Sequence, residues 1–364
     1  MIILKNLENM TLITGVILLN IKHSFFLKNS KKIKRRFFIM KKYNQFEIFR
    51  FIGAFSVLCF HTARHTVFFS KLPHLLQNGP FWVFFFFLLS GFLLTYVYSN
   101  KEFNMLHFYK TRFFKFYPVY FLSLILLLKI RFNILYHVFL IQSWIFKRPM
   151  NYNSSAWYLS TLVFLLLLFP LFLYFSKNKY FSWFVVCINL YTYYFYNYML
   201  KFSFNNESIH ELINYNPLMY IGTFTLGMLT YSIIKNFKSK KLYSLFILLY
   251  IGFLFIFVQY QKFKFYNSSV VALSFVPLIV LLFLDEGFFS KFLGNKFFVY
   301  LGSLSYSIYI LHVPLYIIFK KFNNEITIDL QFLIYFILVF IISNLTKYFI
   351  ENKYYGYLNK KYLK

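Results

Sequence analysis

Charged residues and cysteines are scarce in this sequence. Of its 364 residues only 13% are charged, whereas 60% are hydrophobic and 26% are aromatic. Such a chain has too few polar residues to cover a soluble domain, and its apolar residues occur in blocks long enough to cross a bilayer. The two cysteines, Cys59 and Cys187, both lie inside such blocks, which argues against a disulfide framework. The composition predicts an all-α, polytopic membrane protein.

Acidic residues are also few, with 10 against 39 lysines and arginines, so the formal net charge is +29. A nucleic-acid partner would require these cations on one face. Instead they form short clusters between the apolar blocks, which is typical of loops that face the cytosol and anionic lipid. The expected partner is therefore the lipid bilayer and not a nucleic acid. The excess of Phe and Tyr is typical of an AT-rich genome, so aromatic clusters alone are not interpreted as binding sites.

The chain divides into three parts. Residues 1–45 form a basic N-terminal arm that contains "KNSKKIKRR" (28–36), and its apolar stretch is too short to span and lacks a small-residue cleavage site. Met40 precedes a natural membrane-protein start, so residues 1–39 are interpreted as a mis-called extension. Residues 46–355 form the transmembrane domain, and residues 356–364 form a short cytoplasmic tail. With no soluble domain after the last span, any chemistry is expected in the membrane or on short loops.

Within the transmembrane domain the apolar blocks predict about ten helices in one bundle. Lysines and arginines are more frequent in one set of connecting loops, and the positive-inside rule then predicts that both termini are cytoplasmic. Residues 132–146 are shorter and amphipathic, so an interfacial or re-entrant helix is expected there. The expected spans are 47–66, 80–98, 113–129, 156–176, 180–199, 215–234, 242–260, 267–284, 298–320 and 328–350.

The first expected span, "FEIFRFIGAFSVLCFHTARH" (46–65), carries ionisable residues that hydrocarbon disfavours. Arg50 and His61 lie about 20° apart around a helix and roughly 16 Å apart along it, so they share one face. Arg50 is expected near the cytosolic boundary, one turn after Glu47, and His61 near mid-bilayer, where such groups usually face a polar cavity. The alternatives are a snorkelling Arg50 and a His61 that hydrogen-bonds a neighbouring helix. A metal site at His61 and His65 is not expected, because no third ligand has suitable spacing.

Several motifs occur in a fixed order along the chain, beginning with Arg50, ten residues, and His61. They continue with "FFFLLSGFLL" (85–94), "RFFKFYP" (112–118), "AWYLSTLVFLLLLFP" (156–170), "IGTFTLGML" (221–229), "LGSLSYSIYILHVPL" (301–315) and "YFIENKYY" (348–355). In this order and spacing the sequence resembles the acyltransferase-3 family of integral membrane acyltransferases, which acylate cell-surface glycans. The resemblance covers about residues 45 to 355.

Three departures from the family pattern stand out. Many members carry a glutamate in the fourth span, where this chain has apolar residues around Leu162 and Val163. Lys115 replaces the second arginine of the family's basic motif, and Glu351 is not followed by proline. The length also leaves no room for the periplasmic hydrolase-like domain that some members carry.

The resemblance implies an enzyme that moves an acyl group from acyl-CoA to a sugar hydroxyl. His61 is then the general base or a transient acyl carrier, because a neutral imidazole suits proton transfer near neutral pH. Arg50, Arg112 and Lys115 are expected to bind the phosphates of CoA, although the last two also fit ordinary positive-inside charge. Candidates for the substrate site or channel are Glu47, Tyr309, His312 and Trp157. For His312 the alternative is an ordinary interhelical hydrogen bond. For Trp157 the alternative is packing. Ser90 and Gly91 are expected to serve packing only.

The sequence therefore favours a membrane O-acyltransferase, and within that class an O-acetyltransferase that modifies an envelope polysaccharide or lipopolysaccharide. Acetyl-CoA, or another acyl-CoA, is the donor substrate, no cofactor is expected to stay bound, and the expected location is the inner (plasma) membrane. Glycan specificity is expected from the outside loops 66–79, 144–155 and 200–214. The main alternative function is a transporter or exporter of a surface glycan. A further alternative is a catalytically inactive assembly protein.

Overall fold

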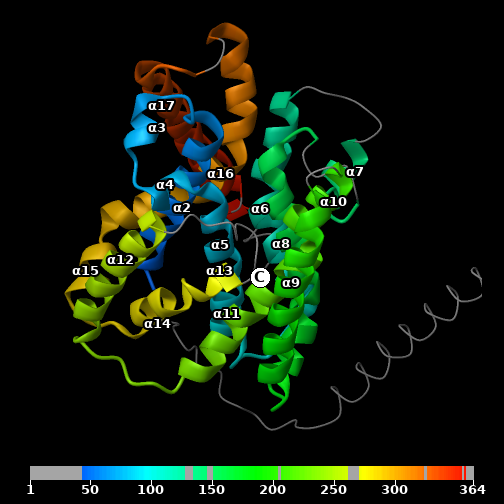
Figure 1. The fold of residues 1–364 in the computed structure, drawn as a ribbon, viewed down its shortest axis with the longest axis vertical. Coiled ribbons are helices and arrows are strands. Elements are labelled where there is room, and N and C mark those ends of the chain that lie inside the picture. The colour runs from blue at the N-terminus through cyan, green and yellow to red at the C-terminus, as the bar shows by residue number, and fades with distance from the viewer. Residues whose placement is uncertain are drawn as a thin grey trace, which may run out of the picture. The chain divides into compact units, whose positions relative to one another are not determined.

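Helices account for all the regular structure in the described part of the chain. The computed structural model describes residues 43–127, 134–145, 151–203, 206–260, 270–323, 326–354 and 356–357. The predicted all-α fold is confirmed (Figure 1), whereas most of the expected N-terminal arm and of the short tail lies outside the described residues. The helices are α2 (Phe46–Thr62), α3 (Val67–Lys71), α4 (His74–Gln77), α5 (Gly79–Tyr98), α6 (Met105–Leu127), α7 (Ile134–Val138), η1 (Ser154–Ala156), α8 (Trp157–Phe175), α9 (Phe181–Ser203), α10 (Glu207–Tyr215), η2 (Pro217–Tyr220), α11 (Ile221–Ile234), α12 (Tyr243–Tyr260), α13 (Val270–Leu273), α14 (Val276–Leu284), α15 (Phe288–Leu293), α16 (Lys296–Asn323), α17 (Asp329–Thr346) and the π-helical η3 (Lys347–Tyr354).

Each of the expected spans coincides with a helix or a helix pair, but not all of these helices have the length and composition of a span. By those two criteria, the described residues contain 5 candidate spans, at Gly79–Tyr98, Ser154–Phe175, Glu207–Ile234, Lys296–Phe322 and Asp329–Tyr354. Shorter apolar helices cover Tyr243–Gln259 and Val271–Leu284. A multi-pass membrane protein is therefore supported, while the count of about ten spans stays a prediction.

Several helices present apolar side chains that nothing else in the described chain covers. On α12 these include Leu249, Phe253 and Ile256, and on α17 they include Leu333 and Ile337. In water such faces would be unfavourable, but against lipid tails they replace one apolar contact by another. The outward faces of α12 and α17 are therefore those expected of a membrane-embedded bundle.

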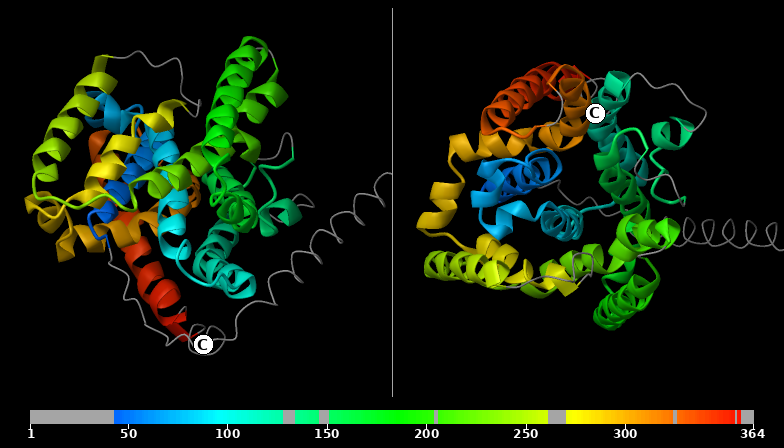
Figure 2. Two further views of the ribbon diagram at one scale, coloured as in Figure 1. Left: turned by 90° about the horizontal axis from the view of Figure 1, so that it is seen from below. Right: turned by 45° about the horizontal axis from the view of Figure 1, so that its top comes forward.

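The helix α2 packs between α16 and α5, and α5 packs in turn against α11. The right-hand view of Figure 2 shows the first helices, in blue, between the orange and red α16 and α17 on one side and the yellow-green α12 on the other. Glycines allow the closest of these contacts. A Cβ at Gly302 of α16 would lie 2.3 Å from the Glu47 carbonyl oxygen, and one at Gly91 of α5 would lie 2.0 Å from that of Phe224. The predicted packing role of Gly91 is thus confirmed.

Two local signals set the ends of the first two long helices. The α2 helix ends at Thr62, four residues before the expected limit, so His61 lies in its last turn. Asn78 accepts a hydrogen bond from the backbone N–H of Phe81 and caps α5, whose first turn contains Pro80. The sequence between them folds into α3 and α4 instead of extending the first span.

The interfacial or re-entrant helix expected at 132–146 is shorter than predicted in its described part, and its polar residues are buried. Only Ile134–Val138 is helical there, and Leu140 has a positive φ of 56° that ends the helix. His137 and Gln142 are fully buried, and the Gln142 amide donates to the backbone carbonyl of Ala156. Gln142, one of the polar residues that suggested a water-facing helix side, therefore anchors this segment inside the protein.

Candidate functional site

A cavity of about 230 Å³ is enclosed by residues of α2, α5, α6, α8 and α16. It contains all three cations expected to bind a donor, Arg50, Arg112 and Lys115, although they come from two different helices. Tyr309, predicted to lie at the substrate site, also lines it. Its other polar lining residues are Ser90, Tyr158, Ser305 and Tyr306. The remaining wall is apolar, so positive charge is concentrated at one place in a largely hydrophobic space.

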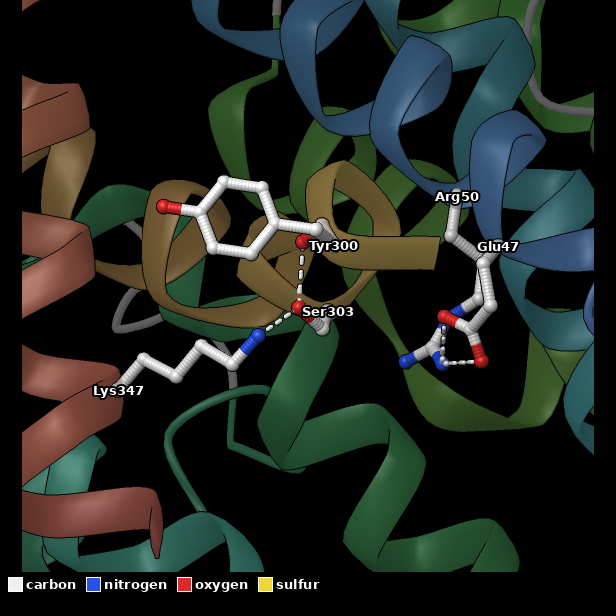
Figure 3. Close-up of polar contacts among 5 residues, drawn as sticks. All are labelled: Glu47, Arg50, Tyr300, Ser303 and Lys347. Atoms are coloured by element: carbon white, nitrogen blue, oxygen red, sulfur yellow. Dashed lines mark hydrogen bonds and ion pairs between the residues drawn. The ribbon is translucent and has the colours of Figure 1, made fainter. Parts of the chain in front are cut away.

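The Arg50 guanidinium pairs with the carboxylate one turn before it, as expected. Arg50 Nη1 lies 3.2 Å from Glu47 Oε2, and the side chains are 33% and 18% exposed, respectively. Figure 3 shows this pair on α2, together with the contact in which Lys347 donates to the Ser303 hydroxyl of α16. Glu47 therefore acts as the counter-ion of a cavity residue. It is not itself among the lining residues.

Arg112 and Lys115 are both on α6, three residues apart, and reach the cavity from one helix face. Arg112 Nε is buried and has no hydrogen-bond partner in the described structure, and its guanidinium carbon lies 5.4 Å from the Phe108 ring centroid. A buried N–H donor without a partner is unfavourable by about 1–3 kcal/mol. An anionic ligand in the cavity would remove that penalty.

Acidic groups near Lys115 come from both ends of the domain. Its electrostatic neighbours are Arg50, Arg112, Glu47 and Glu351. Glu351, in the closing motif of the sequence, accepts a hydrogen bond of 2.5 Å from the Ser307 hydroxyl on α16. The α2 and α6 helices and the π-helical η3 thus contribute charge to one region.

An aromatic wall extends from the cavity toward the interior. Tyr158 of α8 and Tyr309 of α16 have ring centroids 5.2 Å apart, and Phe86 of α5 contacts both rings. Ser90 of α5 lines the same cavity as Tyr158. Ser90 therefore lies at the cavity, in contrast to its expected role in packing alone.

His61 does not line this cavity but meets another predicted residue, His312 of α16. The His61 Nδ1 and His312 Nε2 atoms are 2.9 Å apart, and the planes of the two rings are nearly parallel, at 15°, with centroids 5.2 Å apart. His312 is completely buried, whereas His61 is exposed. Tyr309 joins the two regions, because it lines the cavity and its ring centroid is 6.0 Å from that of His312.

His312 sits at an interrupted part of α16. Pro314 has no backbone N–H, so the carbonyl of Ile310 four residues earlier lacks its helical partner. The Asn153 amide, buried before α8, donates to that carbonyl at 2.9 Å. The Tyr335 hydroxyl of α17 donates to the His312 carbonyl. These contacts hold the helix on both sides of the proline and therefore hold the imidazole.

Trp157 is placed away from both regions. Its ring is 9% exposed and packs against Phe87, Tyr215 and Tyr220. Packing, the alternative named for Trp157, accounts for these contacts. The fourth-span position that lacks a glutamate is different, because Leu162 lines the cavity and makes its α8 wall apolar.

Sequence reasoning missed Asn153 and the cavity role of Tyr158. Tyr158 follows the tryptophan of a quoted motif, so its position in that motif was the available signal. For Asn153 the signal was indirect: a proline inside a long helix frees a carbonyl that another polar group must satisfy. The described end of the 144–155 segment, expected to be an outside loop, is in fact buried at Asn153 and Ser155.

Comparison with known proteins identifies the family of this chain. No curated protein and no solved structure matches the chain. A family model of the acyltransferase-3 family, described as an acyltransferase domain, matches residues 43–348. That match covers nearly the whole chain, including both histidines and all three cavity cations. The chain therefore belongs to the acyltransferase-3 family and is a membrane acyltransferase.

Proposed function

We propose that this protein is an O-acyltransferase that moves an acyl group, in the simplest case acetyl, from cytosolic acyl-CoA to a hydroxyl of an envelope polysaccharide or lipopolysaccharide sugar. The observation that supports the donor is the convergence of Arg50, Arg112 and Lys115 on one cavity. Guanidinium groups bind phosphate with paired, charge-assisted hydrogen bonds, and CoA carries several phosphate charges. The proposed location is the inner membrane, with both termini in the cytosol.

The distance between the cavity cations and His61 suits a donor whose charged group and reactive group are far apart. Arg50 and His61 are on one uninterrupted helix, roughly 16 Å apart along its axis. In acyl-CoA a long pantetheine arm separates the phosphates from the thioester. The phosphates would bind the cavity cations while the thioester reaches toward His61 past the Tyr158 and Tyr309 rings.

The proposed reaction uses His61 as general base. His61 takes the proton of the acceptor hydroxyl, whose oxygen attacks the thioester carbonyl carbon. A carbon–oxygen bond forms, the carbon–sulfur bond breaks, and the proton passes from His61 to the departing thiolate. The products are the acylated sugar and the free thiol of CoA, so His61 returns to its neutral state.

The donor site is tested by binding of labelled acetyl-CoA to the purified protein in lipid nanodiscs. Replacing Arg112 by Gln removes one charge-assisted phosphate contact of about 1.5–3 kcal/mol, so affinity should fall roughly 10- to 100-fold. Lys110→Gln is the matched control. It removes a positive charge from the same helix at an exposed position outside the cavity.

Equal affinity in the Arg112→Gln variant, or equal losses in both variants, would refute the proposed donor site. The acceptor is identified by mass spectrometry of envelope glycans from cells that lack the gene. Loss of an acyl substituent from one glycan supports the proposal, whereas an unacylated glycan that fails to reach the surface supports the transport alternative.

A further inference from the structure

The two histidines, joined through ring nitrogens, form a hydrogen-bonded series with a defined direction. His312 Nδ1 lies 2.8 Å from the carbonyl oxygen of Tyr309 and 3.3 Å from that of Ile308. A backbone carbonyl can only accept, so His312 Nδ1 must carry the proton. In the neutral ring the other nitrogen, Nε2, is then an acceptor.

Because His312 Nε2 is an acceptor, the tautomer of the His61 ring is also determined. His61 Nδ1 faces His312 Nε2 at 2.9 Å, so a hydrogen bond requires the proton on His61 Nδ1. The remaining nitrogen, His61 Nε2, then carries a free lone pair. His61 belongs to the exposed side of the pair, whereas His312 is buried.

We infer that His312 is a positioning residue that holds His61 in the Nδ1–H tautomer and so makes His61 Nε2 the atom that accepts the substrate proton. The role of this tautomer in catalysis rests on the proposed function. The tautomer itself is a property of the resting protein and does not depend on that function. His312 does not touch the substrate in this assignment.

The surroundings of His312 fit an orienting role. The His312 ring is held at Nδ1 by the Tyr309 carbonyl and at Nε2 by His61, while Tyr335 and Asn153 bind backbone carbonyls of α16 around it. A flip of the ring would replace both nitrogens by carbons and so break both ring contacts. The direction of the hydrogen-bond series is therefore built into the fold.

Proton transfer leaves the series intact. When His61 Nε2 takes the hydroxyl proton, His61 becomes an imidazolium whose Nδ1–H still donates to His312 Nε2. His312 keeps both its proton and its neutral state. The charge on His61 is stabilised by the hydrogen bond until the proton leaves with the thiolate.

Two substitutions at position 312 separate an orienting role from simple packing. Gln can place its Oε1 near the former Nε2 and accept from His61, whereas Met fills similar volume without an acceptor of comparable strength. Relative to wild type, His312→Met should lower kcat roughly 10²-fold with an unchanged KM for acyl-CoA, because general-base catalysis supplies a factor of this order. His312→Gln should recover at least a tenth of the wild-type kcat.

Nitrogen-15 magnetic resonance of histidine-labelled protein tests the tautomer without any enzymatic assay. The His61 signals are assigned by their loss in His61→Gln. In wild type and in His312→Gln they should show a protonated Nδ1 and an unprotonated Nε2, and in His312→Met this pattern should change. Size-exclusion chromatography and acetyl-CoA binding verify that each variant is folded.

The outcomes separate this inference from the proposed function. A protonated His61 Nε2 in the neutral wild-type ring overturns the inference whether or not the protein transfers acyl groups. Equal kcat values for His312→Met and wild type overturn it as well. A wild-type protein that shows the Nδ1–H tautomer but transfers no acyl group from any acyl-CoA overturns the proposed function and leaves the tautomer assignment standing. A misfolded Met variant still leaves the wild-type and Gln spectra to decide.

Discussion

His61 and His65 are close in sequence but have different environments in the structure. His61 is in the last turn of α2 and meets His312, whereas His65 lies beyond the end of that helix and is exposed. We expect His61→Ala to lower acyl transfer by roughly 10²- to 10⁴-fold, the usual contribution of a general base. His65→Ala should leave the rate within about twofold, since surface substitutions are nearly neutral. Glycan acylation is measured in cells that make each variant at the wild-type level.

Persistent acylation in His61→Ala cells would show that another group is the base. Retained binding of acetyl-CoA by that variant is the matching control, because Arg50, one of the proposed donor-binding cations, lies roughly 16 Å away from His61 along α2. A loss of donor binding together with activity would instead point to a folding defect.

Residue-level prediction agrees with the structure where one helix was enough, because Arg50 and His61 share α2, whose period is known. Arg112 and Lys115 were expected at the donor site from the resemblance, and the structure places both at the cavity that Arg50 lines. The meeting of His61 with His312 joins residues 251 positions apart, and helical periodicity carries no information about such contacts. Ser90 and Tyr158 were missed for the same reason, since only packing between α5 and α8 brings them to the cavity.

At the scale of elements, the proline in α16 and the amide before α8 form one unit. Asn153 Nδ2 donates to the Ile310 carbonyl that Pro314 leaves without a partner, and also to the Ser123 hydroxyl. Asn153→Leu should therefore lower the free energy of unfolding by about 1–3 kcal/mol, because buried acceptors lose their donor. Unfolding in mild detergent, followed by helical circular dichroism, measures the change.

A double-mutant cycle isolates the contribution of the carbonyl. In a Pro314→Ala background the backbone N–H of residue 314 can bind Ile310, so Asn153→Leu should be less harmful there by about 0.5–1.5 kcal/mol. Additive effects of the two substitutions would mean that Asn153 does not act through the freed carbonyl.

Predicted helices agree with the structure most closely where apolar blocks are long and caps are strong. Asn78 and Pro80 begin α5 one residue before its expected start, and the long apolar blocks at α8 and α17 were also found. In the 132–146 segment the helix is shorter than expected, and Gln142 binds a buried backbone carbonyl. Polarity in a short segment does not distinguish a water-facing surface from an internal hydrogen-bond network.

At the scale of the whole molecule, the charge bias predicts which loops face the cytosol. Lys101, between α5 and α6, is expected in the cytosol, and Lys71, in α3, on the opposite side. Cys59 is buried and Cys187 is exposed, so Cys187→Ser supplies a background with little thiol labelling. A membrane-impermeant maleimide should then label Lys71→Cys in sealed spheroplasts, and Lys101→Cys only after they are opened.

Labelling of Lys101→Cys in sealed spheroplasts would reverse the orientation and place the cavity cations away from cytosolic acyl-CoA.

The sequence predicted the class of the whole molecule because hydropathy reports helix length and lipid contact. It could not establish the number of crossings, because α2, α6 and α9 fall short of a typical span in length or apolar composition. Their place in the bundle depends on packing against neighbours and not on composition.

The ion pair between Glu47 and Arg50 has a consequence for small ions inside the cell. A guanidinium that already holds a carboxylate gains little by exchanging it for another singly charged anion, so such ions should compete poorly at the empty cavity. An anion with several charges can displace the carboxylate and also reach Arg112 and Lys115. Under the proposed function, the pair would therefore favour a donor with several phosphate charges over monovalent anions.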